Sequence, residues 1–187
     1  LVESGSVTKI YTRPKAITAG DVNYPANIFM LWSSSELEAI GIYEIVIDNS
    51  NLKDQEYYIN TDQSFAFADG TVTASYGTAT AKAIADVTND DDTVTPGLKT
   101  NYKAIINQQA GGLLQDTDWM IVRAAEGGTA VPSAITTWRA AVRTKANAMQ
   151  VQIGNAADID ALAALYVYND ATPPVRPLGK FPDVPSS

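Results

Sequence analysis

Residues 113–128 read LLQDTDWMIVRAAEGG, and residues 136–143 read TTWRAAVR. The first stretch ends a run of apolar residues at helical spacing, namely Leu98, Tyr102, Ile105, Ile106, Ala110 and Leu113. The second lies in another helical run that begins after Pro132, with Ser133 as the expected N-cap. Its apolar positions are Ile135, Trp138, Val142, Met149 and Ile153. The two runs predict a helical hairpin with an acidic, tryptophan-bearing corner.

The acidic residues of this corner have a chemical and a structural interpretation. Asp116 and Asp118 precede Trp119, and two carboxylates could hold a hard cation or divide acid and base roles. Each of those roles needs further convergent groups, which this stretch does not show. In the structural interpretation, which we favour, Thr117 or Asp118 caps a new helical turn. Trp119 and the apolar pair Ile121-Val122 then pack on the preceding helix.

Two arginines of the second run, Arg139 and Arg143, are four residues apart and so share one helix face. A phosphate-binding strip would need a glycine-rich cradle or interleaved aromatic residues, and neither accompanies them. The guanidinium fork matches carboxylates, so we expect both arginines to form salt bridges with the acids of LLQDTD. Each exposed pair would contribute about 0–1 kcal/mol. The structural or interface candidates are Asp118, Trp119, Trp138, Arg139 and Arg143.

The first half of the chain has the period of β-strands. Alternation predicts strands within SVTKIYTRP (6–14), GIYEIVIDN (41–49) and EYYIN (56–60). Residues 64–77, SFAFADGTVTASYG, place Asp69-Gly70 between two alternating runs, which predicts a β-hairpin. The stretch SSSELEAIG predicts a short helix near 34–40, capped by serine and stopped by Gly41.

The change of period divides the chain and gives an α+β fold class. We expect a β-rich module with one short helix over 1–88, a linker over 89–97, a helical hairpin module over 98–168 and a proline-rich tail over 169–187. The acidic run NDDDT in the linker lacks the glycine of a calcium loop, so a solvated loop is expected. AADIDALAALY predicts a third helix. The tail carries five of the nine prolines and should be an extended strap or a loose end.

Composition excludes several classes of function. The chain of 187 residues has no Cys and no His, which rules out Ser-His-Asp and Cys-His catalysis and thiolate or imidazole metal ligands. Its formal charge of -8 repels phosphate backbones, so nucleic acid is not an expected partner. No apolar run approaches the roughly 20 residues that span a bilayer, and no membrane partner is expected. We expect no enzyme activity, no catalytic residue, no metal and no cofactor.

Two further expectations concern the ends and the aromatic residues of the chain. The first residue is Leu, and we expect that upstream residues have been processed, cut or left unseen. A flat aromatic surface built from Tyr57, Tyr58 and Tyr76 would support an alternative function, a carbohydrate-binding or host-recognition β-module.

Residues 113–143 resemble the tail-assembly chaperone and tail-fibre assembly proteins of tailed bacteriophages. In that family a TDW-like motif ends one helix, a short linker with a proline follows, and the next helix carries W/Y-R-x-x-x-R. The matching residues here are Thr117, Asp118, Trp119, Pro132, Trp138, Arg139 and Arg143. The likeness covers about 98–166, and DVNYPANIFMLWSSSELEAIGIYEIV also looks like the leader region of phage tail-module proteins.

The resemblance implies a non-enzymatic protein that is associated with the phage tail. It would be a structural component of the tail or tail fibre, or an assembly factor for it, and would act through protein-protein contacts. The implied partners are other tail or tail-fibre proteins, with a homo-oligomer as a further expectation. The implied location is the virion tail, or the host cytoplasm during assembly.

Overall fold

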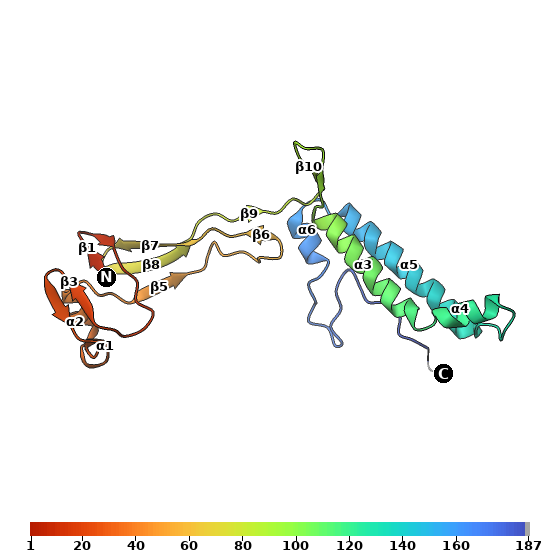
Figure 1. Ribbon diagram of the computed structural model, residues 1–187, viewed down its shortest axis with the longest axis horizontal. Helices are drawn as coiled ribbons and strands as arrows, with labels where there is room; N and C mark the ends of the chain where they lie inside the picture. The colour runs from red at the N-terminus through yellow and green to blue at the C-terminus, as the bar shows by residue number, and fades with distance from the viewer. Residues whose placement is uncertain (186–187) are drawn as a thin grey trace. The chain divides into compact units, whose positions relative to one another are not determined.

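The computed structural model describes residues 1–185, and the chain forms two compact units, Leu1–Thr80 and Ala81–Ser187. The first unit is built mainly from strands and the second mainly from helices (Figure 1). This confirms the α+β class that the change of period predicts. The sequence ends the β-rich module at residue 88, whereas the first compact unit ends at Thr80.

Short elements surround a small apolar cluster at the start of the first unit. They are β1 (Val2–Glu3), β2 (Ser6–Val7), β3 (Ile17–Ala19), β4 (Val22–Tyr24), α1 (Ile28–Leu31) and α2 (Ser34–Ala39). Strands β1 and β2 pair with each other, as do β3 and β4. The cluster has four buried members, Leu1, Ile17, Ile28 and Ile42. The sequence predicts one short helix in this module, and the structure has two.

Helix α2 confirms the predicted helix and its end signals. The Glu36 backbone N–H donates to Ser33 Oγ, while the Ser33 N–H donates to Glu36 Oε2 at 2.8 Å, which completes a capping box. The Ser33 backbone N–H also holds the pKa of Glu36 below its usual range. Gly41, after the helix, has a φ of +80°, and a Cβ there would lie 2.5 Å from the Val2 carbonyl oxygen. Only glycine fits this position.

The strand predicted over 6–14 is largely wrong, because only Ser6–Val7 is in a strand. The Thr8 and Lys9 amides both donate to the Leu1 carbonyl oxygen instead of to a neighbouring strand. The sequence pattern of residues 6–14 thus predicted a strand for which these residues have no partner strand beyond Ser6–Val7. Residues 8–16 form no regular element.

A three-stranded sheet follows, in the order β5-β8-β7. Strands β7 (Gln63–Ala68) and β8 (Thr71–Tyr76) form the hairpin predicted at Asp69-Gly70, whose φ values are +50° and +74°. Two positive φ values in a two-residue loop match the right-handed twist of the strands. Strand β5 (Ile45–Asp48) pairs with β8 in parallel. Nearby, β6 (Tyr58–Ile59) pairs with β9 (Thr80–Ala81).

The second unit begins with a small hairpin of β10 (Val87–Thr88) and β11 (Val94–Thr95). The acidic run predicted as a solvated loop forms its exposed turn, and the predicted linker thus contains β11. The next helix is α3 (Leu98–Gln115). Its N-cap residue is Gly97, which has no side chain that could accept a capping hydrogen bond. Asp86 caps it from a distance, since its Oδ1 accepts from the Gly97 N–H at 2.8 Å.

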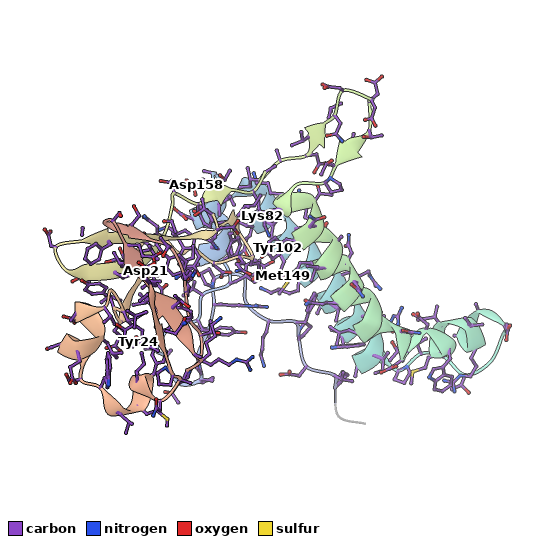
Figure 2. The ribbon with its side chains drawn as sticks, turned by 60° about the vertical axis from the view of Figure 1, so that its left-hand side comes forward. Asp21, Tyr24, Lys82, Tyr102, Met149 and Asp158 are labelled. Carbon is purple, nitrogen blue, oxygen red and sulfur yellow. The ribbon has the colours of Figure 1, made fainter. Side chains whose placement is uncertain are left out.

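Three further helices complete the second unit, namely α4 (Asp118–Ala125), α5 (Ser133–Asn155) and α6 (Ile159–Ala164). Helices α3 and α5 lie side by side as the predicted hairpin (Figure 1). Tyr102 of α3 and Met149 of α5 are both buried and lie close together (Figure 2). Ser133 is the first residue of α5 and not its N-cap, because the Pro132 carbonyl accepts the first helical hydrogen bond, from the Thr136 N–H.

Residues 169–175 of the proline-rich segment form an exposed loop, in which the Asn169 N–H donates to the Val175 carbonyl oxygen, and residues 176–182 form a strap on the helices. Residues 186–187 of the predicted tail lie outside the described residues. Leu178 is completely buried, and its carbonyl oxygen accepts from Lys145 Nζ at 2.9 Å. The Trp138 indole Nε1 donates to the Pro182 carbonyl oxygen at 3.1 Å. The strap therefore adds both apolar contacts and hydrogen bonds to the core of the helical unit.

Candidate functional site

The corner between α3 and α4 is held by one arginine from α5. Arg139 is buried, with its residue 9% exposed. Its guanidinium donates to the Leu114 carbonyl oxygen at 2.8 Å, to Thr117 Oγ1, and to Asp118 Oδ1 at 2.7 Å. The Leu114 carbonyl belongs to the last turn of α3, where backbone acceptors have no partner within the helix. A cation at a helix C-terminus also interacts favourably with the helix dipole.

The Arg139–Asp118 pair confirms one of the two predicted salt bridges. The Arg139 side chain is 11% exposed and the Asp118 side chain is 58% exposed, so the pair lies at the boundary with solvent. The prediction for Arg143 is wrong. This side chain is exposed, and it forms no ion pair within residues 1–185. Arg143 lies one helical turn further from the corner, which removes its side chain from the acids.

The two tryptophans of the site have opposite environments. Trp138 is 5% exposed and belongs to the core, whereas Trp119 is 55% exposed. The predicted packing of Trp119 and Ile121-Val122 on the preceding helix is therefore wrong. The reason is the position of α4: none of its residues is buried, so this short helix leaves most of its apolar surface uncovered. Thr117 is the residue before α4, as predicted, but its hydroxyl donates to the Leu114 carbonyl instead of capping α4.

The exposed residues of α4 form a surface of defined chemistry. Trp119 and Val122 are 55% and 56% exposed and share one face of the helix with Arg123, at i, i+3 and i+4 spacing; we call these three residues the α4 surface. Ile121, 42% exposed, lies two residues from Trp119 and therefore on another face. The guanidinium carbon of Arg123 lies 4.7 Å from the centre of the Trp119 ring, which is a cation–π contact. Tryptophan and arginine are the residue types most enriched among those that dominate binding energy at protein interfaces.

The position of Arg123 is fixed by the turn that follows α4. The Gly128 N–H donates to the Arg123 carbonyl oxygen at 2.9 Å, and Gly127 has a φ of +83°. A Cβ on Gly128 would lie 2.8 Å from Arg123 Cγ, so only glycine lets the side chain pass. The Arg123 Nε is buried without a hydrogen-bond partner, and the side chain forms no ion pair within residues 1–185. The α4 surface thus combines an apolar area with one cation that is not neutralised.

A second feature, which sequence reasoning missed, is a hollow of about 450 Å³ in the first unit. Three aromatic side chains line it, from Tyr11, Phe29 and Tyr43. Its charged lining residues are Lys9, Glu38 and Glu44. These residues come from separate short segments with no common period, so no local pattern indicates that they meet. The volume is in the range of small-ligand sites.

The tyrosines expected to form an aromatic platform do not do so. Tyr57 is 7% exposed, while Tyr58 and Tyr76 are only partly accessible. A flat binding surface needs exposed ring faces, so this part of the carbohydrate hypothesis is wrong. Within residues 1–185, no group of three acidic side chains could hold a metal ion. In the same residues, no helix is both long and apolar enough to cross a membrane.

Comparisons of the chain with protein-family models, with curated proteins and with solved structures find no match. The features of the chain that bear on function are the α4 surface and the corner that supports it.

Proposed function

We propose that the protein is a non-enzymatic, tail-associated protein of a tailed bacteriophage that acts through protein-protein contacts. It would be a structural component of the tail or tail fibre, or an assembly factor for it. The observation that carries this proposal is the exposure of Trp119 beside the stacked Arg123, on a helix without a single buried residue. A tryptophan held open to solvent in this way suits a partner protein that covers it.

The support under the α4 surface favours binding to a partner. Arg139 ties the end of α3 to the start of α4 through three acceptors, so the direction of α4 is set before any partner arrives. A surface that is ordered in advance loses less conformational entropy on binding. Four residues of the phage resemblance, Thr117, Asp118, Trp119 and Arg139, lie at this corner or at the start of α4, so the resemblance and the chemical argument concern the same part of the chain.

A second candidate function is a carbohydrate-binding or host-recognition module, and the hollow of the first unit favours it. Aromatic rings from Tyr11, Phe29 and Tyr43 together with carboxylates suit the apolar faces and hydroxyl groups of a sugar. A glycan-array screen with the full chain tests this function. Binding that a Tyr43→Ala variant loses would support it, and an array without hits would count against it.

The proposed phage role is tested by quantitative mass spectrometry of purified mature particles, which gives the copies of this chain per virion. A fixed copy number identifies a structural component. Presence in infected cells together with absence from particles identifies an assembly factor. Absence from both contradicts the phage role.

A variant comparison links that role to the α4 surface. Trp119→Ala should abolish incorporation into particles or assembly of the tail, while Val151→Ala should not. Val151 is a suitable control because it is an apolar residue of α5 with 60% exposure, away from α4 in the chain. Equal behaviour of the two variants would remove the α4 surface from the proposal.

A further inference from the structure

Strand β5 has an open edge. It is the last strand in the order β5-β8-β7, and within residues 1–185 it pairs with β8 alone. Its outward backbone N–H and C=O groups are therefore available to another strand. Two of its β-branched side chains, Val46 and Ile47, are 54% and 64% exposed. Such an edge is a template for pairing with a further chain segment.

Charges mark the two ends of this edge. Glu44 precedes β5 and Asp48 ends it, and both are exposed. They are four residues apart, so their side chains project on the same face of the strand as Val46. Ile45 and Ile47 project on the other face, beside the apolar Val72 and Ala74 of β8. One face of this edge therefore carries Glu44, Val46 and Asp48, an apolar side chain between two acidic ones, and the other face carries the apolar Ile45 and Ile47.

Residues 8–13, TKIYTR, carry the complementary pattern. Lys9 and Arg13 are also four residues apart, and both are exposed, as is Ile10 at 44%. Residues 8–13 belong to no strand in residues 1–185: the Lys9 backbone N–H and C=O both bond to Leu1, and Thr12 and Arg13 lie in a bend. The segment contains two of the four Lys and Arg residues of the first unit, which also has ten Asp and Glu residues and so a formal charge of 4 minus 10, or -6. It is a basic segment on an acidic unit.

We propose that two copies of this chain associate when residues 8–13 of each copy become extended and add to β5 of the other. In antiparallel register, Lys9 lies opposite Asp48 and Arg13 lies opposite Glu44. Between them, Ile10 lies opposite Ile47, Tyr11 opposite Val46 and Thr12 opposite Ile45. Every cation meets a carboxylate, and Ile10 extends the apolar face of the sheet. Parallel pairing would give the same charge match, but antiparallel ladders are slightly more stable per residue.

The position of both segments in one copy favours a closed dimer. Lys9, Ile10 and Tyr11 line the same hollow as Glu44 and Ile45, so both segments face one side of the first unit. When one surface carries both complementary segments, two copies can pair about a twofold axis, with each segment of one copy contacting the other segment of its partner. Inside one copy the hollow separates the two segments, and no ladder joins them in residues 1–185. This self-association is independent of the proposed phage function.

The test is sedimentation velocity of the full chain over a wide range of protein concentration. The unmodified protein should form dimers. Lys9→Glu/Arg13→Glu and, separately, Glu44→Lys/Asp48→Lys should each raise the dimer Kd by about tenfold or more, because two attractions become repulsions. An equimolar mixture of the two variants should regain the dimer, since each supplies the partner that the other lacks.

The design separates specific pairing from general charge repulsion. The first variant takes the formal charge from -8 to -12, and the second takes it to -4. If general repulsion between like-charged molecules decided the association, the variant with charge -12 would dimerise more weakly and the variant with charge -4 more strongly. The proposed register predicts that both variants dimerise more weakly. Lys53→Glu/Arg143→Glu is the matched control, with the same charge as the first variant, and should keep the Kd unchanged. A monomeric unmodified protein, a dimer indifferent to both variants, or folded variants whose mixture stays monomeric would overturn the proposal.

Discussion

Arg139 Nη2 donates to Asp118 Oδ1 at 2.7 Å, although the arginine is buried and the aspartate is more than half exposed. The pair is therefore unequal, since removing the arginine takes a donor away from three acceptors at the corner, although the Leu114 carbonyl oxygen keeps the Thr117 hydroxyl and Asp118 keeps its access to water. Removing the aspartate leaves the arginine with two remaining acceptors and access to water.

Arg139→Ala should lower the free energy of unfolding by about 2–4 kcal/mol, because hydrogen bonds to a buried charged group are lost together. Arg143→Ala, one turn along the same helix, should change it by less than about 0.5 kcal/mol, as expected for an exposed side chain that forms no ion pair within residues 1–185. Urea denaturation followed by circular dichroism measures both. Equal effects of the two variants would contradict the role of Arg139 at the corner.

Trp138→Ala should destabilise the helical unit by about 3–5 kcal/mol, as for other truncations of large core residues. Trp138→Phe keeps much of the packing but removes the donor to the Pro182 carbonyl oxygen. This variant should make the strap more sensitive to proteases while lowering the melting temperature less than Trp138→Ala does. Thermal melting and limited proteolysis separate the two effects. An unchanged melting temperature for Trp138→Ala would exclude this residue as an anchor of the helices.

Trp119→Ala should leave stability within about 1 kcal/mol, because the ring is already exposed and loses mainly its contact with Arg123. The same substitution should abolish binding at the α4 surface. Melting of the purified variant provides the first measurement, and the particle assay provides the second. A large loss of stability would show that Trp119 is part of the core and not of a binding surface.

Leu178→Ala should cost about 3 kcal/mol, since the side chain is fully buried in the strap and its removal leaves a cavity. Val175→Ala is the control from the same segment, with 53% exposure, and should cost much less. Chemical denaturation of both variants tests whether the proline-rich strap is part of the folded core. Similar small effects would mean that the strap contributes little.

Asp86 makes the start of α3 sensitive to acid. The Thr100 hydroxyl and the Gly97 backbone N–H donate to its carboxylate and hold the pKa of Asp86 below its usual range. Because the folded pKa is the lower one, this stabilisation is complete above the pKa of the unfolded chain. It is lost as pH falls through the folded value.

Asp86→Asn should therefore lower the melting temperature at neutral pH and should reduce the further loss on acidification relative to the unmodified protein. Melting curves from neutral to strongly acidic pH measure the difference. Parallel curves for the two proteins would contradict this assignment.

Local signals in the sequence predicted the elements whose determinants are adjacent in the chain. Asp69-Gly70 predicted the β7–β8 hairpin, and Ser33 with Glu36 predicted α2, because the groups that decide these structures lie within a few residues. The apolar stripes likewise predicted α3 and α5. The salt bridge of Arg139 was expected from the types and spacing of residues at the corner.

Features that depend on distant segments were not predictable in the same way. The parallel pairing of β5 with β8 joins residues that have no local relationship, and the segment 6–14 alternates but lacks a partner. Asp86 caps a helix that begins twelve residues later, beyond any local spacing rule. Trp119 has the pattern of a packed residue, and only the position of α4 shows that nothing covers it. The choice of Arg139 over Arg143 likewise depends on tertiary distance.

The central place of β8 in its sheet sets an order of events during folding. The β7–β8 hairpin closes through a two-residue loop, whereas β5 must cross a much longer stretch of chain to reach the same strand. Short loops close faster and at lower entropic cost, so β5 should be the last strand to join. Until β5 joins, the hairpin presents the unpaired edge of β8, and the β5 edge that another chain could use comes into being only when β5 has covered it.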